Sequence, residues 1–319
     1  MAKKIIAVAG ATGAQGGGLV RAIMADPDSG FTARALTRNP NSDKAKTLAD
    51  LGAEVVMANV DDVESLRKAF EGAYGAFCVT FFWEHFSPEK ETAQARAQAR
   101  AAKEAGVQHV IWSTLEDTRK SIPLDDNRMP TLNGRYKVPH LDSKAEADDD
   151  FRKLPATLLL TSFYYDNLIY FGMGPKRDAD GSLAITLPMA DATLSAIAAE
   201  DIGKCSLGIF KRGQEFIGKT VGIAGEHLTG TQMAAELSKA IGEGVRYNYV
   251  PPEVFRTFGF PGAEDIGNMF QFFRDFQDDF RAARKLEFSR RLNPELQTFG
   301  TWLEANVNQI PIEPKRVTA

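Results

Sequence analysis

The sequence has few cysteines and histidines, the residues that stabilise small secreted domains through disulfides and bound metals. It contains only two cysteines, Cys78 and Cys205, and four histidines among 319 residues. Two cysteines cannot form a disulfide framework, and such sparing use is typical of a reducing compartment. A chain of this length buries about three-quarters of the surface that it exposes when unfolded, so it needs neither disulfides nor a structural metal. We therefore expect a protein of the cytoplasm, and also of the nucleus, without a metal site.

The sequence also lacks an excess of positive charge and any long apolar run. Its 38 lysines and arginines face 42 aspartates and glutamates, which gives a net charge of -4. Direct nucleic-acid binding is therefore not expected. The apolar run at residues 5–9 is too short for a signal peptide or a membrane span. An apolar fraction of 44% and a charged fraction of 25% indicate an ordinary globular protein without membrane association.

Short apolar runs alternate with helical patterns through the first half of the chain. Strands are expected at residues 5–9, 31–37, 53–57, 76–80, 109–113 and 157–161, and helices through 19–23 and at 44–51, 63–70, 92–105 and 144–154. This alternation is typical of a parallel sheet with helices on both faces. Residues 121–139 are expected to form a long irregular connection, and such loops are usually functional.

These patterns predict an α/β fold. Residues 1–160 are expected to form a Rossmann-type, doubly wound parallel sheet that binds NADP(H) and is completed by later segments. Residues 161–319 have mixed, shorter patterns and are expected to form a smaller mixed α/β lobe that binds a substrate or a partner.

A glycine-rich motif follows the first expected strand and opens the first helix. In such a motif the first glycine, Gly10, permits the tight turn, Gly13 lets the backbone approach a pyrophosphate, and Gly16 lets the helix pack close to the sheet. The free N–H groups and the positive end of the helix dipole favour phosphate. The motif predicts a dinucleotide site; the alternative is a purely structural turn. Its full span is Gly10, Ala11, Thr12, Gly13, Ala14, Gln15 and Gly16, and the following Gly17 and Gly18 are not required by it.

The second strand ends in Thr37-Arg38-Asn39-Pro40, without an acidic residue. An NAD site usually places Asp or Glu there to bind the ribose 2′-hydroxyl, whereas an arginine binds the 2′-phosphate of NADP. Arg38 therefore favours NADP(H) as the cofactor. The alternative is that Arg38 is a solvated surface residue.

The third and fourth strands end in residues that would face the same ligand. Asn59 or Asp61 is placed to contact the adenine amine, although Asp61 equally suits a helix N-cap, and the cap is favoured for Asp62. The fourth strand is followed by aromatic residues that either wall a nicotinamide pocket or pack in the core: Phe81, Phe82, Trp83 and Phe86. The run Asp148-Asp149-Asp150 is expected on a solvated helix face.

His140 and Lys144 have the spacing of the tyrosine and lysine in a short-chain dehydrogenase. Such an enzyme carries Tyr-x-x-x-Lys on one helix face, where the lysine assists the tyrosine that donates the proton. Here the lysine is present, His140 replaces the tyrosine, and Ser113 ends the fifth strand where a carbonyl-orienting serine would lie. Lys144, His140 and Ser113 are therefore the catalytic candidates.

The replacement of the catalytic tyrosine by His140 has two functional interpretations. A third possibility is that His140 only starts a helix and has no functional role. In the first, the protein binds NADP(H) without efficient turnover. In the second, His140 supplies the proton, because an imidazole changes charge near neutral pH. Alternatively the proton comes from a tyrosine elsewhere: Tyr136, Tyr164 or Tyr165.

The motifs resemble those of the NmrA-like family of atypical short-chain dehydrogenases. The resemblance rests on the glycine motif through Gly17, on Thr37 to Pro40, and on Phe260-Pro261-Gly262-Ala263, and it extends to Leu292-Asn293-Pro294 and Thr301 to Glu304. It covers nearly the whole chain and is greatest to the NADPH redox sensors of the HSCARG type. It implies a reductase-like fold, a sensor of the NADPH/NADP ratio, and binding to regulatory partner proteins such as transcription regulators.

The resemblance also implies which residues contact the cofactor, and it leaves self-association into a homodimer open. The implied contacts are residues 10–15, Arg38, Asn39, Pro40, Asn59, Val60, Thr80, Phe81, Phe82, Lys144, Ser162, Phe163, Tyr164 and Tyr165. Family members often carry Asp where this chain has Asn59, which removes a charge and keeps hydrogen-bonding capacity. The alternative function is an NADPH-dependent oxidoreductase acting on a small carbonyl, imine or quinone-like substrate.

Overall fold

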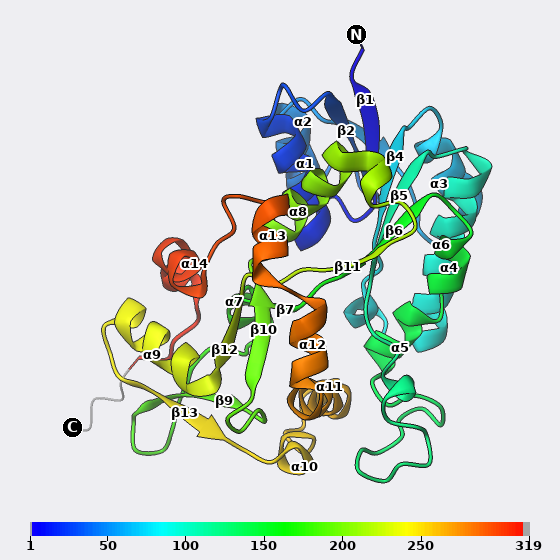
Figure 1. The fold of residues 1–319 in the computed structure, drawn as a ribbon. Coiled ribbons are helices and arrows are strands. Elements are labelled where there is room, and N and C mark those ends of the chain that lie inside the picture. Colours follow the sequence, from blue (N-terminus) through cyan, green and yellow to red (C-terminus); the bar gives the residue numbers. More distant parts are fainter. Residues whose placement is uncertain (1, 315–319) are drawn as a thin grey trace.

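A seven-stranded parallel sheet forms the upper part of the molecule in Figure 1. The structure, a computed structural model, describes residues 2–314. The strand order is β11-β6-β5-β4-β1-β2-β3, with every neighbouring pair parallel. The strands are β1 (Lys4–Val8), β2 (Phe31–Thr37), β3 (Glu54–Met57), β4 (Gly75–Cys78), β5 (His109–Thr114), β6 (Ala156–Leu160) and β11 (Thr220–Gly222). The chain order reverses between β1 and β4, which is the position where doubly wound sheets bind ligands.

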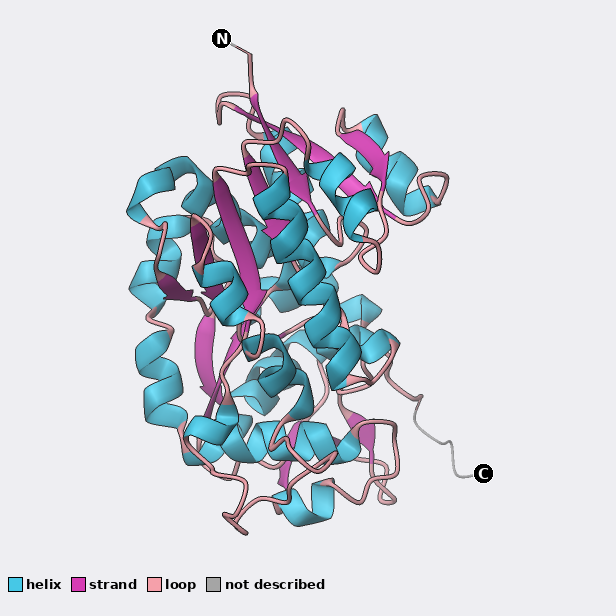
Figure 2. Ribbon diagram, turned by 90° about the vertical axis from the view of Figure 1, so that its right-hand side faces the viewer, coloured by secondary structure: helices cyan, strands magenta, loops and turns pink. Residues whose placement is uncertain are grey.

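Helices cover both faces of this sheet, and the strands are nearly continuous apolar runs because both faces are buried (Figure 2). One face packs against α1 (Ala14–Ala25), α2 (Asp43–Asp50), α8 (Ala199–Arg212) and α13 (Leu286–Leu292). The other face packs against α3 (Val63–Phe70), α4 (Pro88–Glu104) and α6 (Asp148–Arg152). The predicted Rossmann-type fold is confirmed, with the expected strands close to their expected bounds.

The two helices α1 and α8 cross at glycines. A Cβ atom on Gly203 of α8 would lie 2.1 Å from the backbone nitrogen of Leu19, and one on Gly18 would lie 2.9 Å from the carbonyl oxygen of Glu200. Only glycine fits at this crossing. The contact gives Gly18 a packing role that the phosphate motif alone does not require.

The lower part of the molecule in Figure 1 contains two three-stranded mixed sheets. One is β12-β10-β7 and the other is β13-β9-β8. Their strands are β7 (Phe163–Tyr164), β8 (Lys176–Arg177), β9 (Leu183–Leu187), β10 (Thr193–Ile197), β12 (Glu226–Thr229) and β13 (Val245–Tyr249). The helices around them are α7 (Asn167–Tyr170), α9 (Gly230–Ile241), α10 (Pro252–Phe255), α11 (Ala263–Asp275), α12 (Gln277–Ala283) and α14 (Phe299–Asn306). This part is the smaller mixed α/β lobe that the sequence predicts.

The two parts of the molecule are joined by shared elements and by a buried ion pair. The second half of the chain supplies β11, α8 and α13 to the large sheet and its helices. The guanidinium of Arg284, which is fully buried, donates to both carboxylate oxygens of Glu116, at 2.6 and 3.0 Å, and to the carbonyl oxygen of Thr161 at 2.8 Å. Arg284 thereby links the ends of β5 and β6 to the segment between α12 and α13.

The polar helix expected at residues 144–154 is helical over most of that range but is divided: the chain forms α5 (Pro139–Ala145) and then α6. The carboxylate of Asp142 accepts the N–H groups of Lys137 and Val138, which fixes the start of α5 five residues earlier than expected, at a proline. The Asp148 side chain then turns inward and accepts hydrogen bonds from Trp112 and Thr114. Asp148 is therefore not on a solvated face, whereas Asp149 is exposed.

The connection before α5 contains one short 3-10 helix, η2 (Thr118–Lys120), and otherwise lacks helices and strands, as expected for residues 121–139. Another 3-10 helix, η1 (Phe82–Glu84), follows β4, and α4 begins at Pro88 behind its N-cap Ser87, earlier than the expected residue 92. Within residues 2–314 no helix has both the length and the apolar character that crossing a bilayer requires.

Candidate functional site

The glycine turn between β1 and α1 leaves backbone donors available to a ligand. Gly10 has a φ of +61°, which favours glycine, and a Cβ on Gly16 would lie 2.5 Å from the Gly10 carbonyl oxygen. A Cβ on Gly13 would approach one described atom within 4 Å, the Gly10 oxygen at 3.2 Å. Gly13 is thus open on its outer side. Within residues 2–314 no side chain caps α1 and its first turn holds no acidic residue, an arrangement that suits a phosphate.

Gln15, in the first turn of α1, connects two of the candidate residues. Its amide oxygen accepts the hydroxyl of Ser113 at 2.7 Å, and its amide nitrogen donates to the Tyr164 hydroxyl at 2.5 Å. Burial raises the pKa of the Tyr164 phenol. The ends of β5 and β7 are therefore tied to the start of α1 by one neutral hydrogen-bonded chain.

Arg38 lies at the end of β2, where the sequence places it, and it is largely exposed. Its guanidinium donates to the Glu84 carboxylate of η1 at 2.6 Å. The end of β2 has no acidic residue of its own, but the fold places one beside Arg38, because Glu84 comes from a segment distant in the sequence. The neighbouring Asn39 closes the turn before α2 by accepting the N–H of Asn41, and Pro40 follows it at the surface.

The end of β3 is organised by hydrogen bonds among its own residues. Asp62 caps α3 by accepting the N–H groups of Glu64 and Ser65, as the sequence favours. Asn59 accepts the N–H of Asp61 through its side-chain oxygen, and the Asp61 carboxylate accepts from Gln94 of α4. Asp61 is thus not a cap. The exposed loop that includes Val60 lies beside the β2 end.

Lys144 lies in a buried polar cluster that includes a residue not singled out from the sequence. Its ammonium is 2.7 Å from the Glu91 carboxylate of α4, and it donates to the hydroxyl and the carbonyl oxygen of Thr80, at 2.7 and 3.0 Å. The Thr80 hydroxyl itself donates to Glu91 at 2.6 Å. Glu91 is completely buried.

The charge on Glu91 is maintained by its surroundings. Burial acts to raise its pKa, but the Lys144 ammonium, the nearby His85 imidazole and the Thr80 hydroxyl outweigh burial and lower the pKa to about 2. His85 accepts the Ser87 N–H through Nδ1, so its Nε2 carries the hydrogen and faces Glu91 at 3.4 Å. Lys144 is therefore held as half of a buried ion pair.

His140 is also paired, with an aspartate from the smaller lobe. Its Nδ1 lies 2.7 Å from one carboxylate oxygen of Asp265, and its backbone N–H donates to the other at 3.1 Å. The imidazole packs on Trp83, with ring centroids 4.8 Å apart. The Asp265 carboxylate fixes the ring orientation and leaves Nε2 as the second polar atom of a His–Asp dyad.

The remaining predicted contacts divide between the site and the core. Phe82 is buried against Trp83 and His140, whereas Phe81 is 54% exposed. Tyr165 packs between Phe299 and Trp302 in the core of the smaller lobe. Three further residues are placed as follows: Phe163 contacts Phe270 in that core, Ser162 has a buried hydroxyl without a partner within residues 2–314, and Tyr136 lies buried in the loop before α5 beside Arg119 and Arg135.

The structure thus brings the candidates together in two groups. One group is the glycine turn with Gln15, Ser113 and Tyr164; the other is His140 and Lys144 with their carboxylates. Glu91, Asp265 and Glu84 were missed because nothing in their local sequence distinguishes them from surface acids. One signal was available: polar residues recur at helical spacing among the alanines of α4, at Glu91, Gln94 and Gln98, and all of them are buried.

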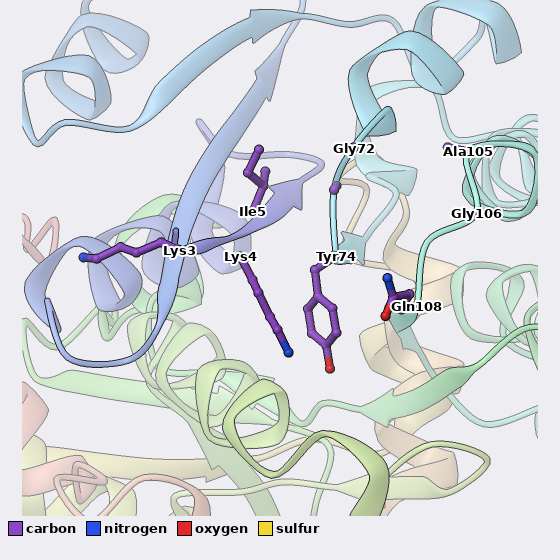
Figure 3. Close-up of a pocket in the computed structure, with 9 residues that line it drawn as sticks. Lys3, Lys4, Ile5, Gly72, Tyr74, Ala105, Gly106 and Gln108 are labelled. Carbon is purple, nitrogen blue, oxygen red and sulfur yellow. The ribbon is translucent and has the colours of Figure 1, made fainter. Parts of the chain in front are cut away.

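A separate cavity of about 360 Å³ lies at the opposite end of the strands from the glycine turn (Figure 3). The Lys4 ammonium lies 4.1 Å from the centre of the Tyr74 ring there, and Gln108 lines the same space. This cavity lies at the amino ends of β1, β4 and β5. Doubly wound sheets bind cofactors at the carboxyl ends of their strands, so the glycine turn is the candidate cofactor site.

The fold and the glycine turn define a Rossmann-type protein with a nucleotide-site geometry, and comparison with known sequences identifies its family. The NmrA-like family profile matches residues 2–303, so the chain belongs to this family. An NmrA-like family domain-containing protein of Dictyostelium discoideum is 28% identical, over 86% of this chain and 89% of that protein. The NmrA-like oxidoreductase FrzB of a Cladobotryum species is also 28% identical, over 84% and 83%.

Solved structures agree with this assignment. NmrA, a negative transcriptional regulator, superposes with a TM-score of 0.77 at 25% identity, over 95% of both chains. The same regulator has been solved in complex with NAD and in complex with NADP, each with a TM-score of 0.76 to this chain. A Citrobacter triphenylmethane reductase has a TM-score of 0.69 at 21% identity and shares the fold.

Proposed function

We propose that this chain is an NADP(H)-binding regulator of the HSCARG type, which senses the NADPH/NADP state and transmits it to a protein partner. One observation carries the proposal. Two groups that correspond to the catalytic set of a short-chain dehydrogenase are already engaged by other residues, and histidine replaces the tyrosine of that set: Ser113 is bonded to Gln15, and Lys144 to Glu91 and Thr80. Such a site favours cofactor binding over turnover.

The residues present fit a dinucleotide. The open backbone at Gly13 and the uncapped start of α1 suit the pyrophosphate, and Arg38 suits a 2′-phosphate. Asn59 offers an amide to the adenine side, and the buried Ser162 hydroxyl, without a partner among the described residues, offers one more donor. When bound, the nicotinamide supplies hydride chemistry; the protein's residues orient it and exclude water. NmrA, solved with NAD and with NADP, supports this assignment.

The regulatory part of the proposal follows from the family. NmrA is described as a negative transcriptional regulator, which supports a protein partner for this chain, and a homodimer is a further candidate assembly. In this proposal residues 1–160, together with Ser162 just after them, hold the cofactor, and residues 161–319 contact the partner. Cys78 and Cys205 are free and buried, which suits a reducing compartment such as the cytoplasm or nucleus.

A second candidate function is an NADPH-dependent oxidoreductase acting on a small carbonyl, imine or quinone-like compound. The His140–Asp265 pair favours it, because a carboxylate that fixes an imidazole is the usual support for a histidine acid or base. Several family relatives are named oxidoreductases. In this alternative His140 would protonate the developing alkoxide.

The deciding experiment combines cofactor titration with turnover. The regulator predicts tighter binding of NADP and NADPH than of NAD, with little NADPH oxidation across a panel of carbonyls, imines and quinones. Arg38→Ala should remove most of the preference for NADP, since one charge-assisted bidentate contact contributes about 1.5–3 kcal/mol. Equal dissociation constants for NAD and NADP in the parent protein would contradict the cofactor assignment.

A variant at His140 separates the two functions. His140→Tyr restores the tyrosine–lysine spacing of a dehydrogenase, and general acid catalysis typically contributes about 10²–10⁴-fold, so this variant should gain measurable reductase activity. Robust turnover by the parent protein that is lost in His140→Ala would instead establish the oxidoreductase.

A further inference from the structure

A cavity of about 420 Å³ lies between η1, the loop before α5 and the start of α11. Its walls include the aromatic rings of Phe82, Phe86 and Phe260. Phe86 and Phe260 are 44% and 37% exposed and line the same cavity, and apolar side chains grouped in this way mark ligand or partner sites. The volume is within the range of small-ligand sites and is too small for a folded partner.

The aromatic wall is held in place against local backbone preference. Phe86 has a φ of +54° at the end of η1, a position where glycine is the ordinary residue. Its ring packs on Trp83 with centroids 5.7 Å apart, and a Cβ on Gly262 would lie 2.8 Å from the Trp83 ring. Asn133, across the cavity, also has a positive φ, of +47°. Residues held in such conformations are concentrated at ligand sites.

One cation in the wall, Arg256, has a fixed position. Its aliphatic stem crosses α11 at Gly267, where a Cβ would lie 2.5 Å from the arginine Cγ. One guanidinium nitrogen donates to the side-chain oxygens of Asn268 and Gln271, at 3.0 and 2.8 Å. These amides are in turn fixed by carbonyl oxygens of the loop before α5, those of Arg128, Pro130 and Lys137. The guanidinium is therefore preorganised.

Arg256 makes no ion pair with any carboxylate in the described part of the chain. It is half-buried, and burial lowers its pKa. Three acids lie near it without forming an ion pair with it. Asp265 and Glu264 line the same cavity, where Asp265 directs both oxygens to His140 and Glu264 is exposed at the rim. Glu253 is exposed one turn before Arg256. A half-buried guanidinium with unused donors and neutral partners is a typical anion-binding group.

We propose that this cavity binds a planar aromatic carboxylate, with the ring between Phe82, Phe86 and Phe260 and the carboxylate on Arg256. The acids in the first turn of α11 favour a monoanion over a doubly charged phosphate. This site goes beyond the proposed cofactor function: none of its residues belongs to the glycine turn, and Phe82 is the one wall residue that the resemblance also assigns to the cofactor. Its wall includes Asp265, so an occupant lies beside the partner of His140.

The test uses the full chain and two probes of the same shape, 2-naphthoate and the neutral 2-naphthamide, in calorimetric titrations. The parent should bind naphthoate saturably and about tenfold or more tightly than the amide, as one charge-assisted pair provides. Arg256→Met, which keeps the aliphatic stem, should lose this preference. Arg246→Met removes the same charge at a surface pair with Asp178 and should keep it.

Phe260→Ala provides a second variant in case Arg256→Met disturbs the loop, and it should weaken both probes equally. Saturating NADP should leave naphthoate binding in place. Equal affinity for the two probes, no saturable binding, a preference retained in Arg256→Met, or displacement by NADP would each overturn the proposal. Direct titration of NADP tests the cofactor function separately, so the two failures are distinguishable.

Discussion

The start of α1 and the cluster at α5 face the same edge of the sheet and are built in opposite ways. At α1 the backbone of Gly13 is open and α1 has no capping side chain within residues 2–314. At α5 the titratable side chains are already paired, Lys144 with Glu91 and His140 with Asp265. Unpaired polar groups cost stability unless a ligand satisfies them. The contrast supports the proposed cofactor site at α1. At α5 the charges are paired, although the Ser143 hydroxyl and one Glu91 oxygen there are buried without a hydrogen-bond partner among residues 2–314.

The largest effect on stability is expected on substitution of Glu91 in the α5 cluster. Glu91→Leu leaves the Lys144 ammonium buried without its partner, and breaking a buried pair in this way typically costs about 3–5 kcal/mol. Urea unfolding of the variant measures the loss. The double variant Glu91→Leu/Lys144→Met removes both charges and should recover most of the stability. A double variant as unstable as the single one would show that the ion pair is not the cause.

The same pair predicts a pH dependence. The folded pKa of Glu91, about 2, lies below that of an unfolded glutamate, which is about 4.3. Its contribution to stability is therefore fully present above the unfolded pKa and is lost as the pH falls toward 2. In the double variant the acid-induced loss between these pH values should be smaller than in the parent.

The substitution Gly13→Val tests the start of α1. The backbone at Gly13 is extended, with φ −94° and ψ −177°, and its outer side is clear, so the protein should remain folded. The side chain would occupy the space expected for the pyrophosphate, and NADP affinity should fall at least about 100-fold, or roughly 2.7 kcal/mol. Calorimetric titration measures the affinity. Gly16→Ala is the contrasting variant: its Cβ meets the Gly10 backbone, so it should lose stability.

Asp148 provides a further test near the α5 cluster, because Trp112 lies between Asp148 and Lys144. Burial raises its pKa to about 6, although hydrogen bonds from Thr114 and Trp112 act to lower it. This pKa exceeds the unfolded value, so the associated stability is present at low pH and lost as the pH rises through about 6. Asp148→Asn should be more stable than the parent at pH 7.5 by roughly 1–2 kcal/mol.

Thermal unfolding of Asp148→Asn at pH 5 and pH 7.5 checks this expectation, and the advantage should be smaller at pH 5. Asp149→Asn is the matched control, because its side chain is 90% exposed and should show no such difference. An equal effect of both variants would assign the change to net charge rather than to burial.

The smallest expected effect is at Glu84, which would compete with the 2′-phosphate for Arg38 in the proposed cofactor site. Glu84→Gln should raise NADP affinity about two- to fivefold and leave NAD affinity unchanged, since exposed pairs contribute only about 0–1 kcal/mol. Glu104→Gln removes the same charge from an exposed pair with Arg100 and controls for net charge. A parallel change in NAD affinity would mean that Glu84 does not act through Arg38.

Much of the structure around the start of α1 could be predicted from the sequence, because it is formed by consecutive residues. The glycines of the turn, the strand before them and the helix after them are consecutive, so spacing alone indicated a nucleotide site. The cap at Asp62 is also local and is confirmed. The expected helix at 144–154 is interrupted between α5 and α6. Asp148, at the start of α6, turns inward to Trp112 and Thr114, a tertiary contact that the local sequence does not reveal.

The sequence by itself determined the parallel α/β fold, the NmrA-like family and the position of the glycine turn, because these depend on periodicity and on consecutive residues. Only the tertiary structure decided the partners of the charged groups: Glu84 beside Arg38, Glu91 on Lys144, Asp265 on His140 and Glu116 on Arg284. Each pair joins segments far apart in the chain, and an acid that is buried looks the same in a sequence as one in water. Only its surroundings set its charge and its role.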